Sequence, residues 1–257
     1  MTDLVTGEDN ADVRQQQLSL HPQAFRPNFL WTAQLPTSWA FLDTHPASWQ
    51  RQAERIIDQF YSGQRLKSAQ RKAIYARLEE AVKAAQDNKV LLSFVLPGTL
   101  DDGEMSACTL LVRWQSFSPQ SASMTIVDTA FSGREGFEHR TIDNNAVYAL
   151  FFGRSQIGPL TDRRTIWNYQ AALLVPWVAM VSGVAPGEGL APTIRDMVIR
   201  LTNSMNTFPE LTGRVLDPEL ALESEQLGDL HAADDDIVLN CGGGRIEVKG
   251  VCDGSER

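Results

Sequence analysis

The spacing of apolar residues along this chain changes near Val90. Between 48 and 87 the apolar residues recur every three or four positions, which predicts two amphipathic helices with a stop at Gly63. After Val90 they form short runs of strand length, over 90–96, 108–114, 146–152, 167–174 and 178–184. Two helices followed by a block of strands predict an α+β fold in which a mostly antiparallel sheet is packed by helices.

Four further segments complete the predicted order. Residues 28–36 and 39–42 predict two strands that form a hairpin, with its turn at Pro36. Residues 121–130 predict a short helix. A last helix is predicted over 192–208, with one apolar stripe that packs against the sheet. That stripe consists of Ile194, Met197, Val198, Leu201, Met205 and Phe208.

The acidity of the chain is concentrated in one stretch. The net charge is −9, and residues 209–236 hold nine acids and one base, while residues 29–208 hold 16 acids and 17 bases. The acidic stretch repels itself and has few aromatic residues, so it does not fold alone. We therefore predict four segments. They are a disordered N-terminal segment over 1–27, an α+β core domain over 28–208, an acidic linker or tail over 209–236 and a β-hairpin-like segment over 237–257.

The distribution of charge and apolar residues narrows the range of partners. A nearly neutral core with an acidic stretch lacks the basic footprint of a nucleic-acid-binding protein. No apolar run reaches the roughly 18 residues of a membrane span, and the N-terminus has no signal-peptide pattern, so we expect a cytoplasmic protein.

The helices over 51–89 hold nine bases and five acids. The acidic stretch could therefore fold back onto them or contact an oppositely charged partner, and a solubilising tail is the simpler alternative.

No motif for catalysis or cofactor binding is complete. The segment 153–158 follows a predicted strand as a nucleophile elbow does, but Ile157 stands where the elbow needs glycine. The glycines at 242–244 favour a hairpin turn, because no helix follows to complete a phosphate-binding loop. The cysteines and histidines lack zinc-site spacing. Three acids in one loop lack the spacing of a calcium loop; they are Asp101, Asp102 and Glu104. We therefore predict no metal, no cofactor and no assigned catalytic residue.

An enzyme of unrecognised type remains an alternative. Its cleft would lie near the end of the predicted strand 146–152, where a histidine base would need a nucleophile and an orienting group close to it. The residues that could serve are Asp101, His139, Asp143 and Ser155. An oligomeric structural subunit is a further alternative.

Tryptophans and arginines supply the candidate binding residues. Three tryptophans could line a ligand cleft, although core packing is their simpler role. Three arginines lie in or at the end of the loop predicted over 153–164. The candidate binding residues are Trp31, Trp39, Arg154, Arg163, Arg164 and Trp167.

The order of elements also resembles a known fold family. Trp31 to Pro36 followed by Trp39, the strand pair 170–175 and 178–184, and the helix ending at 204–208 are similar to PsbP-like α/β/α sandwich proteins, and within them to the actinobacterial LpqN-like family. The resemblance covers about residues 28–208. It implies a non-enzymatic binding or adaptor protein that acts through protein–protein contacts, for example in a secretion or assembly system. Members are often exported lipoproteins, whereas this chain has no lipobox cysteine.

Overall fold

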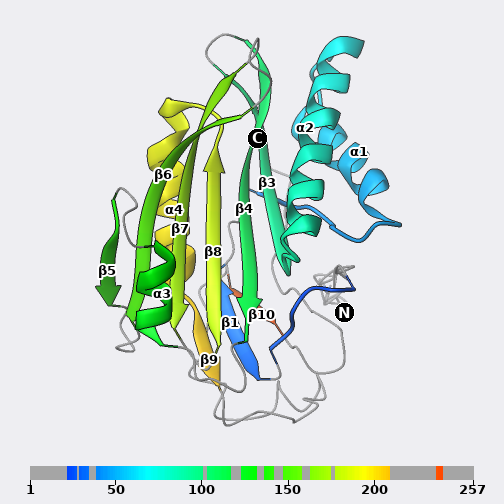
Figure 1. The fold of residues 1–257 in the computed structure, drawn as a ribbon. Coiled ribbons are helices and arrows are strands. Elements are labelled where there is room, and N and C mark those ends of the chain that lie inside the picture. The colour runs from blue at the N-terminus through cyan, green and yellow to red at the C-terminus, as the bar shows by residue number, and fades with distance from the viewer. Residues whose placement is uncertain are drawn as a thin grey trace, which may run out of the picture.

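The computed structural model describes residues 22–27, 29–34, 39–100, 103–116, 123–131, 136–141, 147–157, 163–174, 177–208 and 236–239. Most of the strands form one seven-stranded sheet in the order β2-β3-β4-β8-β7-β6-β5, and all neighbouring strands are antiparallel (Figure 1). These strands are β2 (Ala40–Phe41), β3 (Leu92–Thr99), β4 (Met105–Gln115), β5 (Glu138–Thr141), β6 (Val147–Ile157), β7 (Arg164–Leu174) and β8 (Val178–Ala185). The predicted α+β class with an antiparallel sheet is thus confirmed.

Helices cover both faces of this sheet. On one face, the α4 face, α4 (Ala191–Asn203) packs behind β7 and β8 after a short 3₁₀ turn, η1 (Glu188–Leu190) (Figure 1). On the other, the α3 face, α1 (Trp49–Phe60) and α2 (Ser68–Asp87) cover β3 and β4, and α3 (Met124–Phe131) covers β6.

Close packing of α4 against β8 depends on Gly183. A Cβ atom at this position would lie 2.5 Å from Ile194 and 2.7 Å from Val198. The apolar stripe of α4 therefore rests directly on the strand backbone, and Leu201, in the last turn of the helix, is fully buried. A larger residue at 183 would force the helix away from the sheet.

A second, three-stranded sheet has the order β10-β1-β9 and is also antiparallel. Its strands are β1 (Leu30–Gln34), β9 (Asn206–Phe208) and β10 (Asp236–Leu239). It packs on the large sheet through Trp31, whose ring lies edge-on to that of Trp114 on β4 with the centroids 5.1 Å apart. The first and the last strand of the described chain, β1 and β10, thus lie in one sheet that packs on the main core.

The structure corrects the predicted N-terminal hairpin. β1 pairs with β9 and β10, whereas β2 pairs with β3 at the edge of the large sheet. The two segments therefore belong to different sheets. Local turn signals at Pro36 did not reveal this, because strand partners are chosen by long-range packing.

Two other boundaries differ from the sequence prediction. The last helix ends at Asn203, and Phe208 lies in β9, where the backbone pairs with β1. The loop predicted over 153–164 is shorter, because β6 continues to Ile157 and β7 begins at Arg164. The polar ends of β6 and β7 remain paired by backbone hydrogen bonds, and the Gln156 side chain donates a hydrogen bond to the Thr165 hydroxyl on the facing strand.

The predicted division into four segments stays a prediction. Residues 22–27 precede the expected core, yet Ala24 is buried in the main core cluster. Of the C-terminal segments, 209–235 and 240–257 lie outside the described residues, and 236–239 forms β10. Within the described part of the chain, no helix has the length and apolar content needed to cross a membrane.

Candidate functional site

The three candidate tryptophans belong to the core. Trp31 is fully buried and Trp39 is 6% exposed, so neither can line a surface cleft. Trp167 is half-buried and packs against the main core cluster, opposite Arg154 in the β6–β7 ladder. These three tryptophans therefore pack in the core, which is the simpler of the two roles that the sequence predicts for them.

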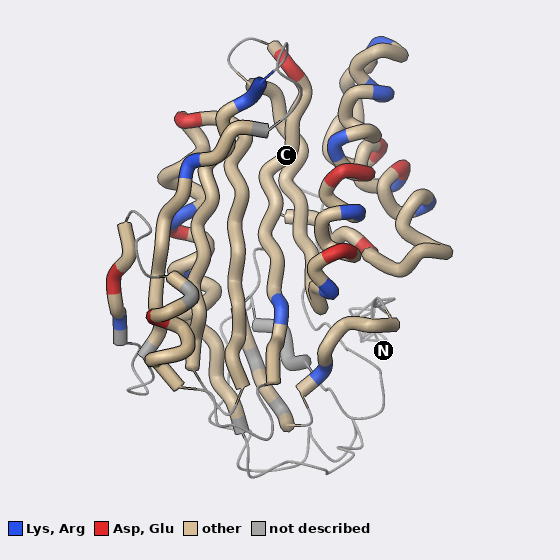
Figure 2. The backbone as a smooth tube through the Cα atoms, viewed as in Figure 1, with Lys and Arg blue, Asp and Glu red and all other residues tan. Residues whose placement is uncertain are grey.

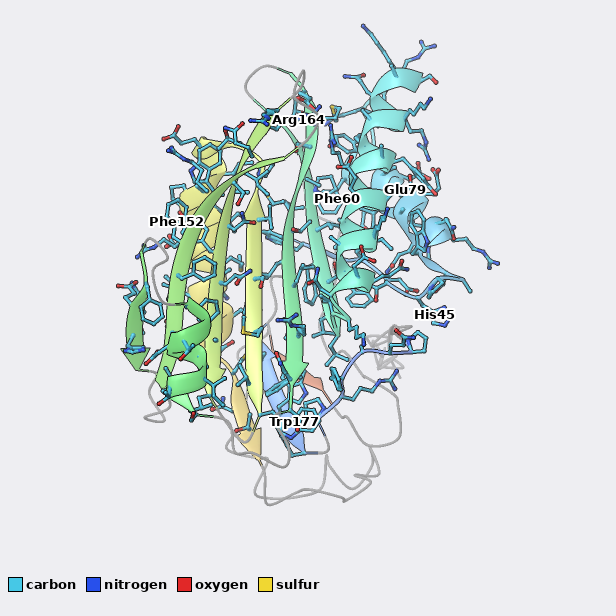
Figure 3. All side chains as sticks on the ribbon, in the orientation of Figure 1. His45, Phe60, Glu79, Phe152, Arg164 and Trp177 are labelled. Carbon is cyan, nitrogen blue, oxygen red and sulfur yellow. The ribbon has the colours of Figure 1, made fainter. Side chains whose placement is uncertain are left out.

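The candidate arginines do not form one site. Arg154 and Arg163 are exposed. Arg164 lies at the upper end of the sheet, where its Nη1 is 2.5 Å from Glu104 Oε1 (Figure 3). Glu104 Oε1 also accepts a bond from Arg77 Nη2 at 3.2 Å. Arg164 thus ties β7 to the start of β4 and to α2, which is a structural role.

The residues of the enzyme alternative are not brought together where the structure describes them. His139 Nε2 lies 2.7 Å from Asp128 Oδ1, and both side chains are 40% exposed or more. Ser155 lies six residues along β6 from Ala149, the cross-strand partner of His139, which is about 20 Å. Asp101 and Asp143 lie outside the described residues. The predicted cleft therefore joins no histidine to the serine that was its candidate nucleophile.

Metal ligands and reactive thiols do not point to a site either. Among the residues that the structure describes, no group of three His, Cys, Asp or Glu side chains could hold a metal ion. Cys108 is buried in β4, and its burial raises the pKa of the thiol to about 12. Only the thiolate is a good nucleophile, so Cys108 is a core residue at neutral pH.

A different group of residues stands out at the lower end of β3 and β4. Figure 2 shows basic residues of β4, of the turn after α2 and of segment 22–27 gathered in this corner of the molecule. They are Arg113, Lys89 and Arg26, and we name them, together with Phe25, the basic corner. The Leu91 N–H bonds the Val112 carbonyl at 2.9 Å, so the turn that carries Lys89 lies beside the end of β4 that carries Arg113.

The cations of the basic corner lack acidic partners in the described structure. Arg26, Lys89 and Arg113 form no ion pair with a described Asp or Glu. Arg113 is half-buried and is the only charged residue of β4 and β8, and burial lowers the pKa of its guanidinium. Asp87, at the end of α2, is the acid nearest in sequence to Lys89 and is exposed. The corner therefore carries an excess of positive charge in a chain that is acidic overall.

Phe25 gives the corner an apolar contact point. It is 49% exposed, the highest exposure of any large apolar residue in the described chain. Its ring lies 6.0 Å from the Lys89 ammonium, within reach of a cation–π contact. Aromatic and arginine side chains are enriched in protein interfaces, whereas lysine is depleted there, so Phe25 together with Arg26 and Arg113 is typical of a binding surface.

The backbone at Lys89 is strained for the residue that it carries. Lys89 has a φ of +52°, the left-handed conformation that favours glycine. Its N–H donates to the Gln86 carbonyl at 3.0 Å and the next N–H, of Val90, to the Ala85 carbonyl at 2.9 Å, which is the Schellman pattern of a helix end. Lysine therefore stands where glycine would fit better.

The sequence contained a signal for part of this corner. Phe25 and Arg26 stand at the end of an otherwise polar segment, but their adjacency to Lys89 and Arg113 depends on the fold.

Comparisons of this chain with family models, with curated proteins and with solved structures found no match.

Proposed function

We propose that this chain is a cytoplasmic binding or adaptor protein, and that its basic corner takes up an acidic, partly apolar segment of a protein partner. The observation that carries this proposal is the exposed Phe25 beside three cations without described acidic partners. Carboxylates of the partner would neutralise Arg113 and Lys89, and an apolar side chain would cover the Phe25 ring.

The charge of the whole chain favours an acidic peptide over a nucleic acid. A net charge of −9 repels a long polyanion, whereas a short segment meets only the local positive field. The resemblance to LpqN-like accessory proteins suggests a secretion or assembly system as the setting. That setting is part of the proposal.

The test uses a labelled 12-residue peptide of alternating acidic and leucine residues, titrated against the full chain and followed by fluorescence anisotropy. We expect Arg113→Gln, Lys89→Gln and Phe25→Ala each to weaken binding by about three- to ten-fold, since each removes one hot-spot contact. The matched control is Arg55→Gln, an exposed arginine on α1, which should leave the affinity unchanged. Equal affinity of the triple variant and the parent would refute the proposal.

Two further measurements sharpen the result. A single-stranded DNA of equal charge should bind more weakly than the peptide, and tighter binding of the DNA would overturn the class of partner. A variant with the nine acids of 209–236 changed to amides should bind the peptide more tightly if that stretch competes for the corner. Raising the salt concentration should weaken peptide binding, because exposed charges are screened within about 3 Å at 1 M salt.

A further inference from the structure

A separate hollow opens on the α4 face, between α4 and the edge strand β5. Its cavity volume is about 300 Å³, and its floor consists of Leu150, Phe152 and Tyr169. Figure 3 labels Phe152 beside β6, close to the edge of the sheet that β5 forms. Small-molecule sites span about 300–1,000 Å³, so the hollow suits a ligand of one or two rings. The basic corner faces the opposite side of the sheet through Arg113, so the two sites are independent.

The floor of the hollow is mostly apolar and includes two aromatic rings. Phe152 and Tyr169 are cross-strand partners on β6 and β7, and their rings stack with centroids 4.8 Å apart and planes 28° apart. Leu150 lies two residues along β6 on the same face and is 2% exposed. A planar ring can extend this stack, because aromatic rings prefer offset stacking at such separations.

One charged group at the rim of the hollow, Glu138, already has an ion-pair partner. Glu138 Oε1 accepts bonds from Arg140 Nη2 at 2.7 Å and from Arg140 Nε at 3.0 Å. Both Arg140 donors meet the same carboxylate oxygen, so the pair lacks the parallel two-oxygen fork of the strongest carboxylate–guanidinium contacts. A cationic ligand would therefore have to compete with Arg140 for this carboxylate.

The other charged group, Arg195 on α4, is not satisfied in this way. Its nearest described acids, Glu138 and Asp196, are both 3.9 Å away, beyond hydrogen-bond distance. The Arg195 side chain is 43% exposed and lines the hollow beside its apolar floor. Burial raises the pKa of the Tyr169 hydroxyl, so Tyr169 adds no negative charge to the hollow.

We propose that this hollow binds a small monocarboxylate with a flat apolar body. The ring extends the stack that Phe152 forms with Tyr169, and the carboxylate accepts hydrogen bonds from the Arg195 guanidinium. The planar fork of arginine matches the two oxygens of a carboxylate, which sets this ligand apart from a neutral molecule of the same shape.

The test titrates 2-naphthoate into the full chain by isothermal calorimetry. We expect saturable binding, and we expect Arg195→Gln to weaken it at least about ten-fold, since a charge-assisted bidentate contact is lost. Arg195→Lys, which keeps the charge without the fork, should fall between the two. Glu138→Gln should strengthen binding, because it removes a nearby negative charge, and Arg55→Gln on α1 should not change it.

Several outcomes would overturn the assignment. They are no saturation up to about 10 mM 2-naphthoate, equal affinity of Arg195→Gln and the parent, and equal affinity for the neutral 2-naphthamide. Tighter binding of 2-naphthylmethylamine would show that Glu138 recognises a cation. Circular dichroism and the unfolding midpoint of each variant check that the half-exposed Arg195 can be changed without loss of the fold.

Discussion

Exchanging Lys89 for glycine separates the stability of the helix end from its role in binding. A side chain in the left-handed conformation costs about 1–2 kcal/mol, and Lys89 has a φ of +52°. Glycine relieves this cost but loses about 0.5–1 kcal/mol of conformational entropy on folding. Lys89→Ala keeps the Cβ atom and, like Lys89→Gly, removes the contact with Phe25. We therefore expect Lys89→Gly to be more stable than Lys89→Ala by about 0.5–1 kcal/mol.

The assay is urea unfolding followed by tryptophan fluorescence. With a urea dependence of about 2–3 kcal/mol/M, the midpoint of Lys89→Gly should lie about 0.2–0.5 M above that of Lys89→Ala. Lys89→Asn should fall between them, because asparagine tolerates this conformation better than alanine. Both the glycine and the alanine variant should bind the acidic peptide equally weakly. A glycine variant no more stable than the alanine variant would refute the strain argument, and an alanine variant with the affinity of the parent would remove Lys89 from the binding site.

Three other outcomes are expected. Leu201 is fully buried, so Leu201→Asp places an unpaired charge between α4 and the sheet and should lower the free energy of unfolding by at least about 3 kcal/mol. An unfolding midpoint equal to that of the parent would show that Leu201 does not pack between α4 and the sheet. In a chain with Cys241→Ser and Cys252→Ser, the Cys108 thiol should not gain reactivity toward a disulfide reagent between pH 7 and pH 9, because its pKa of about 12 keeps it protonated, and denaturant should expose it at once. Amide exchange over 209–236 should be slower at low salt than at 1 M salt if its acids dock on cations, and full exchange at the earliest time in both conditions would leave a solubilising tail.

Part of the fold follows from local pattern alone. The amphipathic spacing before Val90 predicts α1 and α2, and the apolar runs after it predict five of the strands of the large sheet. Such patterns are readable because each element must bury one face, whichever elements it meets. For the same reason, the α4 stripe through Leu201 was predicted to pack on a sheet, and it does.

The candidate sites depended on contacts that local pattern does not encode. The chemistry of tryptophan predicts Trp31 and Trp39 as binding residues, but both side chains are buried in the core. The charge of Arg164 likewise predicts a binding residue, but its guanidinium pairs with Glu104, 60 residues away in the chain.

The α+β class, the main helices and strands, and the concentration of acid over 209–236 can all be predicted from the order of residues along the chain. The pairing of β1 with β9 and β10, and the approach of the turn that carries Lys89 to the end of β4 that carries Arg113, appear only in the folded chain. The physical reason is that periodicity reports which face of an element is buried, whereas strand partners and side-chain neighbours are chosen by contacts between distant segments.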